Sequence, residues 1–518
     1  MFSKYDVIVI GSGAGGGTLV HRLAATGKKI LLLERGDFLP RERENWDPVE
    51  VFHRGRYLAK EKWRDAAGNF FQPYTHYFVG GNTKMYGAAL LRLRQSDFGE
   101  VRHHGGISPA WPLSYRDFEP YYDQAEKLYS VHGERGLDPT EPPGASPLPF
   151  PGVPYEPRMS ELAAELAAAG LAPFPIPLAV RLPSDGRELP GPAYKLSNFD
   201  GFPDLTEVKA DAQVVAVEPA LARANVTLLT RAYVERLETD ASGRRVSEVV
   251  VRRDSDGGAS ELRFAADFVV LAAGAVNSAA ILLRSRSERH PRGLANGSDQ
   301  VGRNYMTHHN GALVMLSPSK ENPAQFQKSF GLADFYHRAD DSELPLGLVQ
   351  TMGKMDFDWL EALGREAWPG ASAEQMSRHA VELFLTAEDL PSPENRVVVG
   401  ADGAIEIHYH DTNAEAYNRL YAKTVEKLRQ RPGRPQDEVY VGGRLGIGGV
   451  SHQSGTLRMG ADPASSVVDT NNKAHELDNL YTADSSFFPS CGAVNPSLTI
   501  MANALRVGDI LAERLGQS

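Results

Sequence analysis

The stretch over residues 5–34, YDVIVIGSGAGGGTLVHRLAATGKKILLLE, decides the fold of this chain. Residues 5–10 are rich in Val and Ile and predict a strand buried on both faces. A glycine-rich turn over residues 11–17 leads into a helix predicted over residues 18–26, and residues 30–33 predict a second buried strand. Strand, turn, helix and strand form one βαβ unit, which is typical of an α/β domain with a parallel sheet.

The turn Gly11-Ser12-Gly13-Ala14-Gly15-Gly16 fits the dinucleotide-binding pattern G-x-G-x-x-G. Gly11 permits the tight turn, Gly13 lets a pyrophosphate approach the backbone, and Gly16 allows close packing of helix on strand. The helix N-terminus offers free N–H groups to the phosphates. Glu34 ends the next strand, where a ribose-binding acid favours FAD or NAD over NADP. The alternatives are a glycine-rich turn in another α/β protein and a solvated acid at the strand end.

Composition excludes several other classes of protein. The 518 residues are 42% hydrophobic and 23% charged, which is enough for a large core and roughly two to four domains. A net charge of -11 argues against binding to nucleic acid. Cys491 is the only cysteine, so no intrachain disulfide can form, and we expect it to be a small buried hydrophobe. No signal peptide or membrane span is recognisable, so we expect a cytoplasmic protein without membrane contact.

The rest of the chain predicts a mixture of helices and strands. Helices are predicted over residues 159–169, 275–283, 414–430 and 495–515, and strands over residues 226–229, 232–238, 246–252, 267–272, 396–399 and 405–409. Three stretches rich in Pro and Gly, over residues 137–154, 173–192 and 201–205, predict long surface connections.

Motifs along essentially the whole chain resemble those of the glucose–methanol–choline (GMC) oxidoreductase family. They are VGGNTKMYG (79–87), WPLSY (111–115) with YYDQAE (121–126), VVLAAGAVNSAA (269–280), VGRN (301–304), ENRV (394–397), SHQSGTLRMG (451–460) and VNPSLT (494–499). The resemblance implies FAD rather than NAD. It also implies an α/β fold in which residues 1–100, 200–310 and 440–518 form a Rossmann-like FAD-binding domain. Residues 101–199 and 311–439 would form a substrate domain of antiparallel sheet with helices and a connection that covers the flavin.

The same resemblance implies which residues contact FAD. They are Gly11, Gly13, Gly16, Glu34, Gly80, Gly81, Asn82, Met85, Val234, Ala273, Gly274, Asp484, Asn495 and Thr499. Asp484 could instead be a turn acid at a strand end. In pyranose oxidases of this family a histidine of the second glycine motif bonds covalently to the flavin, and Met85 stands at that position here. We therefore predict non-covalent FAD; His76 and Lys84 lie nearby, but the motif does not nominate them.

The family's catalytic pair corresponds here to His452 and Asn495. An alcohol must lose its O–H proton while its C–H hydride leaves toward flavin N5. A neutral imidazole is a suitable base at neutral pH, and an Asn side chain can orient the hydroxyl through hydrogen bonds. His452 could instead be a buried structural histidine. Asn495 followed by Pro496 also fits the N-cap and first position of the last helix, whose positive end would then point at the flavin.

The resemblance extends to bacterial relatives of pyranose oxidase, some of which are glycoside 3-oxidases. It rests on Asn495 in the second catalytic position and on the stretch FQKSF over residues 326–330. It implies oxidation of a secondary sugar hydroxyl to a ketone, with electrons passed to O2, giving H2O2, or to a quinone. Val450 and Gln350 are the predicted substrate contacts. The alternatives are a GMC oxidase or dehydrogenase of choline-like, aliphatic or aromatic alcohols, and a lyase that keeps FAD without net redox chemistry.

One cluster outside these motifs could bind a metal. Glu406, His408 and His410 share one face of a predicted strand. The polar face of an ordinary strand explains them equally, and we expect no metal. His308 and His309 stand where the family has a structural histidine.

Overall fold

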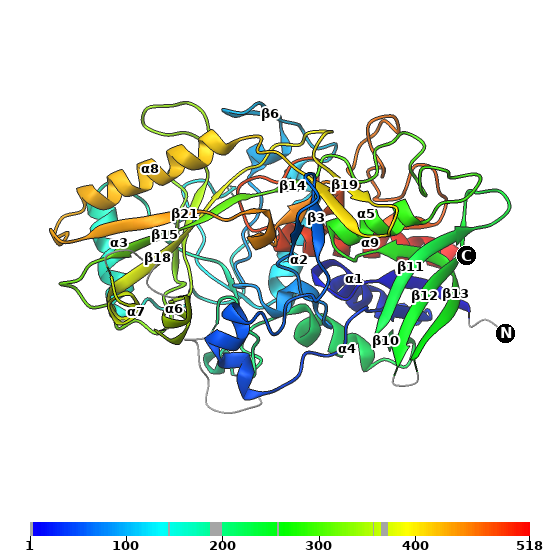
Figure 1. Cartoon of the computed structure of the whole chain (residues 1–518), viewed down its shortest axis with the longest axis horizontal. Coiled ribbons are helices and arrows are strands. Elements are labelled where there is room, and N and C mark those ends of the chain that lie inside the picture. The colour runs from blue at the N-terminus through cyan, green and yellow to red at the C-terminus, as the bar shows by residue number, and fades with distance from the viewer. Residues whose placement is uncertain are drawn as a thin grey trace.

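The computed structural model describes residues 4–142, 144, 146–186, 199–255, 258–355, 357–363 and 371–517. The chain forms two parts that lie side by side (Figure 1). One part is built on a mixed sheet and contains both ends of the described chain. The other part is built on an antiparallel sheet, with α8 lying along it.

The first sheet has the strand order β10-β2-β1-β13-β12-β11, and β23 also pairs with β13. Its strands are β1 (Lys4–Ile10), β2 (Ile30–Leu33), β10 (Val226–Leu229), β11 (Ala232–Thr239), β12 (Val246–Ser255), β13 (Gly258–Leu271) and β23 (Leu480–Thr482). The strands β10, β2, β1 and β23 pair in parallel with their neighbours, whereas β11, β12 and the first half of β13 are antiparallel. The long strand β13 therefore joins a Rossmann-type sheet to a three-stranded meander.

Helices α1 (Ala14–Ala24), α5 (Ala275–Arg284) and α9 (Ser497–Gln517) belong to this part. Gly508 of α9 lies so close to α1 that a Cβ there would be 2.7 Å from Arg22 Cγ. The helix α1 begins at Ala14, four residues before its predicted start. The prediction failed because glycines have low helix propensity. Here their small size is needed, because a Cβ on Gly15 would stand 1.8 Å from the Ala483 carbonyl oxygen.

The second sheet has the strand order β21-β15-β18-β17-β16-β8, and every neighbouring pair is antiparallel. Its strands are β8 (Phe174–Pro175), β15 (His309–Leu316), β16 (Phe330–Leu332), β17 (Leu348–Thr351), β18 (Ala380–Ala387) and β21 (Val439–Arg444), accompanied by α3 (Pro157–Ala168), α6 (Phe357–Leu363), α7 (Ala373–His379) and α8 (Ala414–Gln430). The division expected at residue 440 falls inside β21. We therefore place the division after Arg444.

The remaining strands and helices lie outside the two large sheets. They are β3 (Trp63–Asp65), β4 (Phe70–Phe71), β5 (Val101–Arg102), β6 (Ile107–Ser108), α2 (Tyr115–Leu128), β7 (Val131–His132), β9 (Leu178–Ala179), α4 (Glu218–Leu221), β14 (Met306–Thr307), β19 (Arg396–Val399), β20 (Ile405–His408) and β22 (Gln453–Ser454). The predicted hairpin is present as β19 and β20. Within the stretch over 173–192, residues 187–192 lie outside the described residues. Part of the remainder forms the buried strands β8 and β9, so the prediction of a surface connection is wrong there.

The start of the last helix also differs from the prediction. Helix α9 begins at Ser497, and the Pro496 carbonyl accepts a hydrogen bond from the Ile500 N–H at 3.1 Å. Pro496 therefore occupies the capping position, and Asn495 precedes it with its side chain free for another role. Over the described ranges, no helix combines the length and the apolar composition that a membrane crossing requires.

Candidate active site

A cavity of about 560 Å³ is lined by residues from both parts of the chain. Most of the residues predicted to contact FAD line it: Gly11, Gly13, Glu34, Gly81, Asn82, Met85, Val234, Ala273, Gly274, Asp484 and Asn495. Gly16, Gly80 and Thr499 do not.

The glycine turn at one end of the cavity has the geometry of a phosphate cradle. Gly11 has φ +102°, and a Cβ there would stand 2.3 Å from the Ala272 carbonyl oxygen. A Cβ on Gly16 would stand 1.9 Å from the Gly11 carbonyl oxygen, so this glycine holds helix against strand. Gly13 differs, because a Cβ there would meet no atom closer than 3.8 Å and would enter the cavity. Together with the free N–H groups that begin α1, this open backbone fits a dinucleotide pyrophosphate.

Glu34 is buried at the end of β2 and lines the cavity beside this turn. Its Oε2 accepts hydrogen bonds from the Ser12 N–H at 3.1 Å and the Ser12 hydroxyl at 2.6 Å, and its Oε1 accepts one from the Gly36 N–H at 2.9 Å. Burial raises the pKa of Glu34, and these three hydrogen bonds oppose the rise. The carboxylate therefore fixes the turn, and Oε1 retains a lone pair that a ribose hydroxyl could use.

A second carboxylate, Asp484, joins the ends of β13 and β23. Its Oδ2 accepts from the Gly274 N–H at 2.9 Å and the Ser278 hydroxyl at 2.5 Å, and its Oδ1 accepts from the Ser486 N–H at 2.9 Å. Burial raises its pKa, opposed by these hydrogen bonds. Asp484 thus shapes the middle of the cavity wall as a structural acid while facing the space that FAD would fill.

The second glycine motif packs against the first. The Gly80 N–H donates to the Ser12 hydroxyl at 3.1 Å, and the Asn82 carboxamide oxygen accepts from the His76 N–H at 2.9 Å. Met85 is buried on the cavity wall. Lys84 does not line the cavity and forms a buried ion pair with Asp211 at 2.8 Å.

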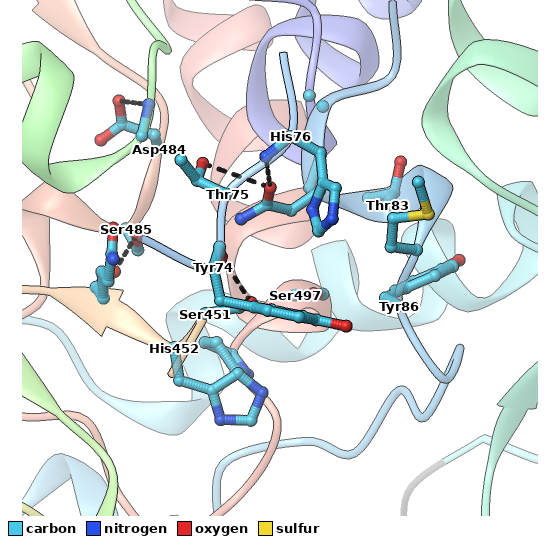
Figure 2. Close-up of a pocket in the computed structure, with 18 of the residues that line it drawn as sticks. Tyr74, Thr75, His76, Thr83, Tyr86, Ser451, His452, Asp484, Ser485 and Ser497 are labelled. Atoms are coloured by element: carbon cyan, nitrogen blue, oxygen red, sulfur yellow. Dashed lines mark hydrogen bonds between the residues drawn. The ribbon is translucent and has the colours of Figure 1, made fainter. Parts of the chain in front are cut away.

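His452 lies at the far end of the cavity, just before β22. Figure 2 shows its side chain below that of Tyr74, and the Ser451 hydroxyl donates to the Tyr74 carbonyl at 2.9 Å. The Nδ1 atom of His452 lies 2.8 Å from Nδ1 of His308 and 3.4 Å from the Asn310 amide nitrogen, which leaves Nε2 to face the cavity. Burial lowers the pKa of His452 well below 6.5, and His308 and Lys328 lower it further. The imidazole is therefore neutral at physiological pH.

Asn495, the predicted partner of His452, lines the same cavity. Its Oδ1 accepts a hydrogen bond from Gln350 Nε2 at 2.6 Å. Gln350 is buried and is absent from the cavity lining. Because Oδ1 is already paired, Asn495 presents its Nδ2 donor to the cavity. Val450 is also buried outside the cavity lining.

The charged groups near His452 are already paired. Lys328 donates to Asp200 Oδ2 at 2.8 Å, and both residues line the cavity. Of the described residues that line the cavity, the other carboxylates are Glu34 and Asp484, which belong to the nucleotide end. The end near His452 therefore offers no unpaired acid within the described part of the chain.

The remaining clusters have structural explanations. Glu406 pairs with Arg64 at 2.7 Å, and His408 Nε2 lies 3.7 Å from Glu406 Oε2. Searched over the residues that the structure describes, groups of three His, Cys, Asp or Glu with metal-binding geometry are absent. Cys491 is buried, as predicted.

Sequence reasoning missed the contacts of three residues at the site: His308, Asn310 and Lys328. Asn310 lies near the start of β15. Lys328 belongs to the FQKSF stretch, which resembles sugar oxidases but does not indicate a contact near His452. The adjacent His308 and His309 gave a signal, but nothing local distinguished them: His309 contacts the Asn413 N–H, whereas His308 contacts His452.

Comparison with known proteins gives a consistent answer. Two family models, both described as GMC oxidoreductase, match residues 194–310 and 371–504. The chain is 31% identical to 6‴-hydroxyparomomycin C oxidase of Streptomyces lividus over 99% of this chain and 92% of that protein. It is 30% identical to paromamine 6′-oxidase of Streptomyces fradiae, over 98% and 91% of the two chains. Fructose dehydrogenase large subunit of Gluconobacter japonicus is 25% identical, over 99% and 98%.

Solved structures show the same fold. Pyridoxine 4-oxidase from Mesorbium loti superposes with a TM-score of 0.65 at 20% identity, covering 98% of this chain and 99% of that one. Formate oxidase of Aspergillus oryzae RIB40 superposes with a TM-score of 0.66 at 15% identity, covering 99% and 98%.

Proposed function

Because this chain belongs to the GMC oxidoreductase family, we propose that it uses non-covalently bound FAD to oxidise a secondary hydroxyl of a sugar or glycoside to a ketone. The observation that carries the proposal is one cavity that joins a dinucleotide-type glycine turn to His452 and Asn495. The nucleotide end would hold FAD through the open backbone at Gly13 and the carboxylate of Glu34. The other end would hold the alcohol.

A sugar-like substrate is supported by the relatives, which are named as oxidases or dehydrogenases of paromamine, hydroxyparomomycin and fructose. The charges at the site distinguish aminoglycoside substrates, which carry several amines, from neutral sugars. Polyamine substrates favour unpaired carboxylates, yet Asp200 is already paired with Lys328 near His452. The arrangement therefore favours a neutral sugar or glycoside over an aminoglycoside.

The side chains explain how the alcohol would be activated. When bound, FAD would supply the acceptor for the hydride, and O2 or a quinone would be the final electron acceptor. His452 is neutral, so its Nε2 lone pair can take the O–H proton. Asn495 Nδ2 can donate a hydrogen bond to the alcohol oxygen and hold it beside that lone pair. The substrate loses one C–H and one O–H bond and gains a C=O bond.

Anaerobic flavin absorbance tests the proposal. The purified holoenzyme is mixed with aldoses, O- and C-glycosides, paromamine, choline and benzyl alcohol. We expect bleaching by a sugar or glycoside and a ketone in the product's carbon NMR spectrum. An aldehyde product, or bleaching only by choline or benzyl alcohol, would replace the proposal with a primary-alcohol or choline-type GMC enzyme. Turnover of a cyanohydrin without bleaching by any alcohol would favour the lyase. Admitting air or a quinone then identifies the acceptor.

Denaturation tests the non-covalent link. We expect acid precipitation to leave FAD in the supernatant and a colourless protein of unmodified mass. The reason is that a thioether at Met85 offers no imidazole nitrogen for the bond. A fluorescent pellet with the added mass of FAD would contradict this. His76 lines the cavity with a buried Nδ1 atom that has no hydrogen-bond partner among the described residues, so loss of such a link in His76→Ala would identify the attachment site.

A further inference from the structure

His308 contacts the proposed base without touching the cavity. It follows β14, whose pairing with β22 brings this segment against the segment that holds His452. The two Nδ1 atoms are 2.8 Å apart, and the rings are nearly perpendicular at 89°. His308 is buried and is absent from the cavity lining. Any effect it has on the reaction must therefore pass through His452.

The other nitrogen of His308 faces a group that can only accept hydrogen bonds. Its Nε2 lies 3.3 Å from the Cys491 carbonyl oxygen. This carbonyl is held by the next residue, because the Gly492 N–H donates to Glu388 Oε1 at 3.0 Å. Glu388 is itself fixed by the Ser108 hydroxyl at 2.7 Å and by His103 Nε2 at 2.9 Å. The position of the acceptor is therefore set by a buried polar network.

The protonation of both rings follows from this geometry. Burial lowers the pKa of His308 and of His452, so each ring is neutral and carries one N–H. The charge of Glu388 opposes the lowering of the pKa of His308, and the charge of Lys328 adds to the lowering of the pKa of His452. A carbonyl accepts, so the single proton of His308 resides on Nε2, and its Nδ1 has a lone pair. His452 must then donate from Nδ1, which leaves the lone pair of His452 on Nε2. The Asn310 nitrogen lies 3.4 Å from the same Nδ1, and its Oδ1 has no other partner among the described residues. This assignment therefore requires the Asn310 oxygen and nitrogen to be exchanged, so that the oxygen also accepts from Nδ1.

We propose that His308 is a positioning residue that fixes the tautomer of His452, so that the lone pair of Nε2 faces the alcohol. This inference rests on the proposed function of His452 as the base. The opposite assignment would place two lone pairs against each other at Cys491 and would put an N–H where the alcohol proton has to go. After proton transfer, His308 continues to accept from Nδ1 of the imidazolium and stabilises it.

Three substitutions separate positioning from packing. In His308→Asn, the amide oxygen takes the place of Nδ1 and can still accept from His452. In His308→Gln, the amide reaches toward Cys491 but offers nothing at the Nδ1 position. His308→Leu removes both contacts. We expect the rate constant of anaerobic flavin reduction to fall about 10- to 100-fold in the Gln and Leu variants, which is less than the roughly 10²- to 10⁴-fold loss of the base itself. We expect His308→Asn to stay within about fivefold of the native rate.

The substrate Kd, the FAD content and the melting temperature serve as controls. A packing role predicts that these change together with the rate and that Asn does not restore the rate; that result would overturn the inference. Equal rates in all three variants would overturn it as well. If the native enzyme bleaches and His452→Ala does not, the proposed function stands whatever the His308 variants show.

A substrate-free measurement tests the same point. The holoenzyme is labelled with ¹⁵N-histidine, and the signals of His452 are assigned by their loss in His452→Gln. We expect Nδ1 of His452 to resonate as a protonated nitrogen and Nε2 as an unprotonated one, with the two forms mixed in His308→Leu. A native spectrum with the proton on Nε2 would overturn the inference.

Discussion

Replacing His452 with alanine is expected to slow anaerobic flavin reduction by the substrate about 10²- to 10⁴-fold, the range of a lost general base. The reason is geometric: with Nδ1 engaged by His308, Nε2 of His452 is the ring nitrogen left for the alcohol proton. FAD binding should persist, because its predicted contacts lie on other segments. The rate is measured by stopped-flow absorbance at saturating substrate.

The pH dependence of the same reaction follows from the lowered pKa of His452. Protonation disables the base, so activity is lost as pH falls through the pKa, and burial places that pKa well below 6.5. We expect the native rate to be level above pH 6.5 and to decline only in more acidic buffer. The surface variant His408→Ala is the matched control and should behave as the native enzyme does. A His452→Ala rate within tenfold of the native one would assign the base elsewhere.

The second large effect concerns two glycines of one turn that are three residues apart. Gly16→Ala should lower the free energy of unfolding of the apoprotein by about 3 kcal/mol or more, because its Cβ would stand 1.9 Å from the Gly11 carbonyl oxygen. Gly13→Ala should leave apoprotein stability nearly unchanged, because its Cβ meets nothing closer than 3.8 Å. That methyl enters the cavity, however, and we expect FAD affinity to fall at least about tenfold.

Denaturant unfolding of the apoprotein and fluorescence titration with FAD measure the two effects separately. Each variant is the control for the other: Gly16→Ala should lower apoprotein stability, and Gly13→Ala should instead lower FAD affinity. If neither variant binds FAD more weakly than the native protein, the pyrophosphate must lie away from this turn. Equal destabilisation of both apoproteins would show that Gly13 is as closely packed as Gly16.

The sequence predicted most reliably the elements that are set by local contacts. The strands β1, β2 and β10, the hairpin of β19 and β20, and α8 each depend on an apolar period and a turn close to them in the chain. The prediction failed where distant contacts decide. Residues 15–17 are helical, and a Cβ on Gly15 would meet the carbonyl of Ala483, a residue far away in the sequence. No property of the glycines themselves indicates this contact.

The site divides in the same way. His452 and Asn495 stood in recognisable motifs, whereas the contact between His308 and His452 spans 144 positions and depends on β14 pairing with β22. The hydrogen bond from Gln350 to Asn495, 145 positions away, has no signal in any short motif. Whether the Gln350 side chain faces the cavity depends on how β17 packs in the sheet, and no short sequence motif predicts that packing.

The packing of α1 against α9 also determines when the nucleotide-binding part can be completed on the ribosome. Arg22 of α1 and Asp509 of α9 form an ion pair at 2.5 Å across 487 positions. At about 5–20 residues per second, α9 is synthesised roughly half a minute to a minute and a half after α1. Until α9 is made, the face of α1 that packs against it lacks its final partner, and Asn495, just before α9, has yet to be made. The nascent chain is therefore inactive and exposed until translation is nearly finished, and we expect chaperones to shield its first βαβ unit.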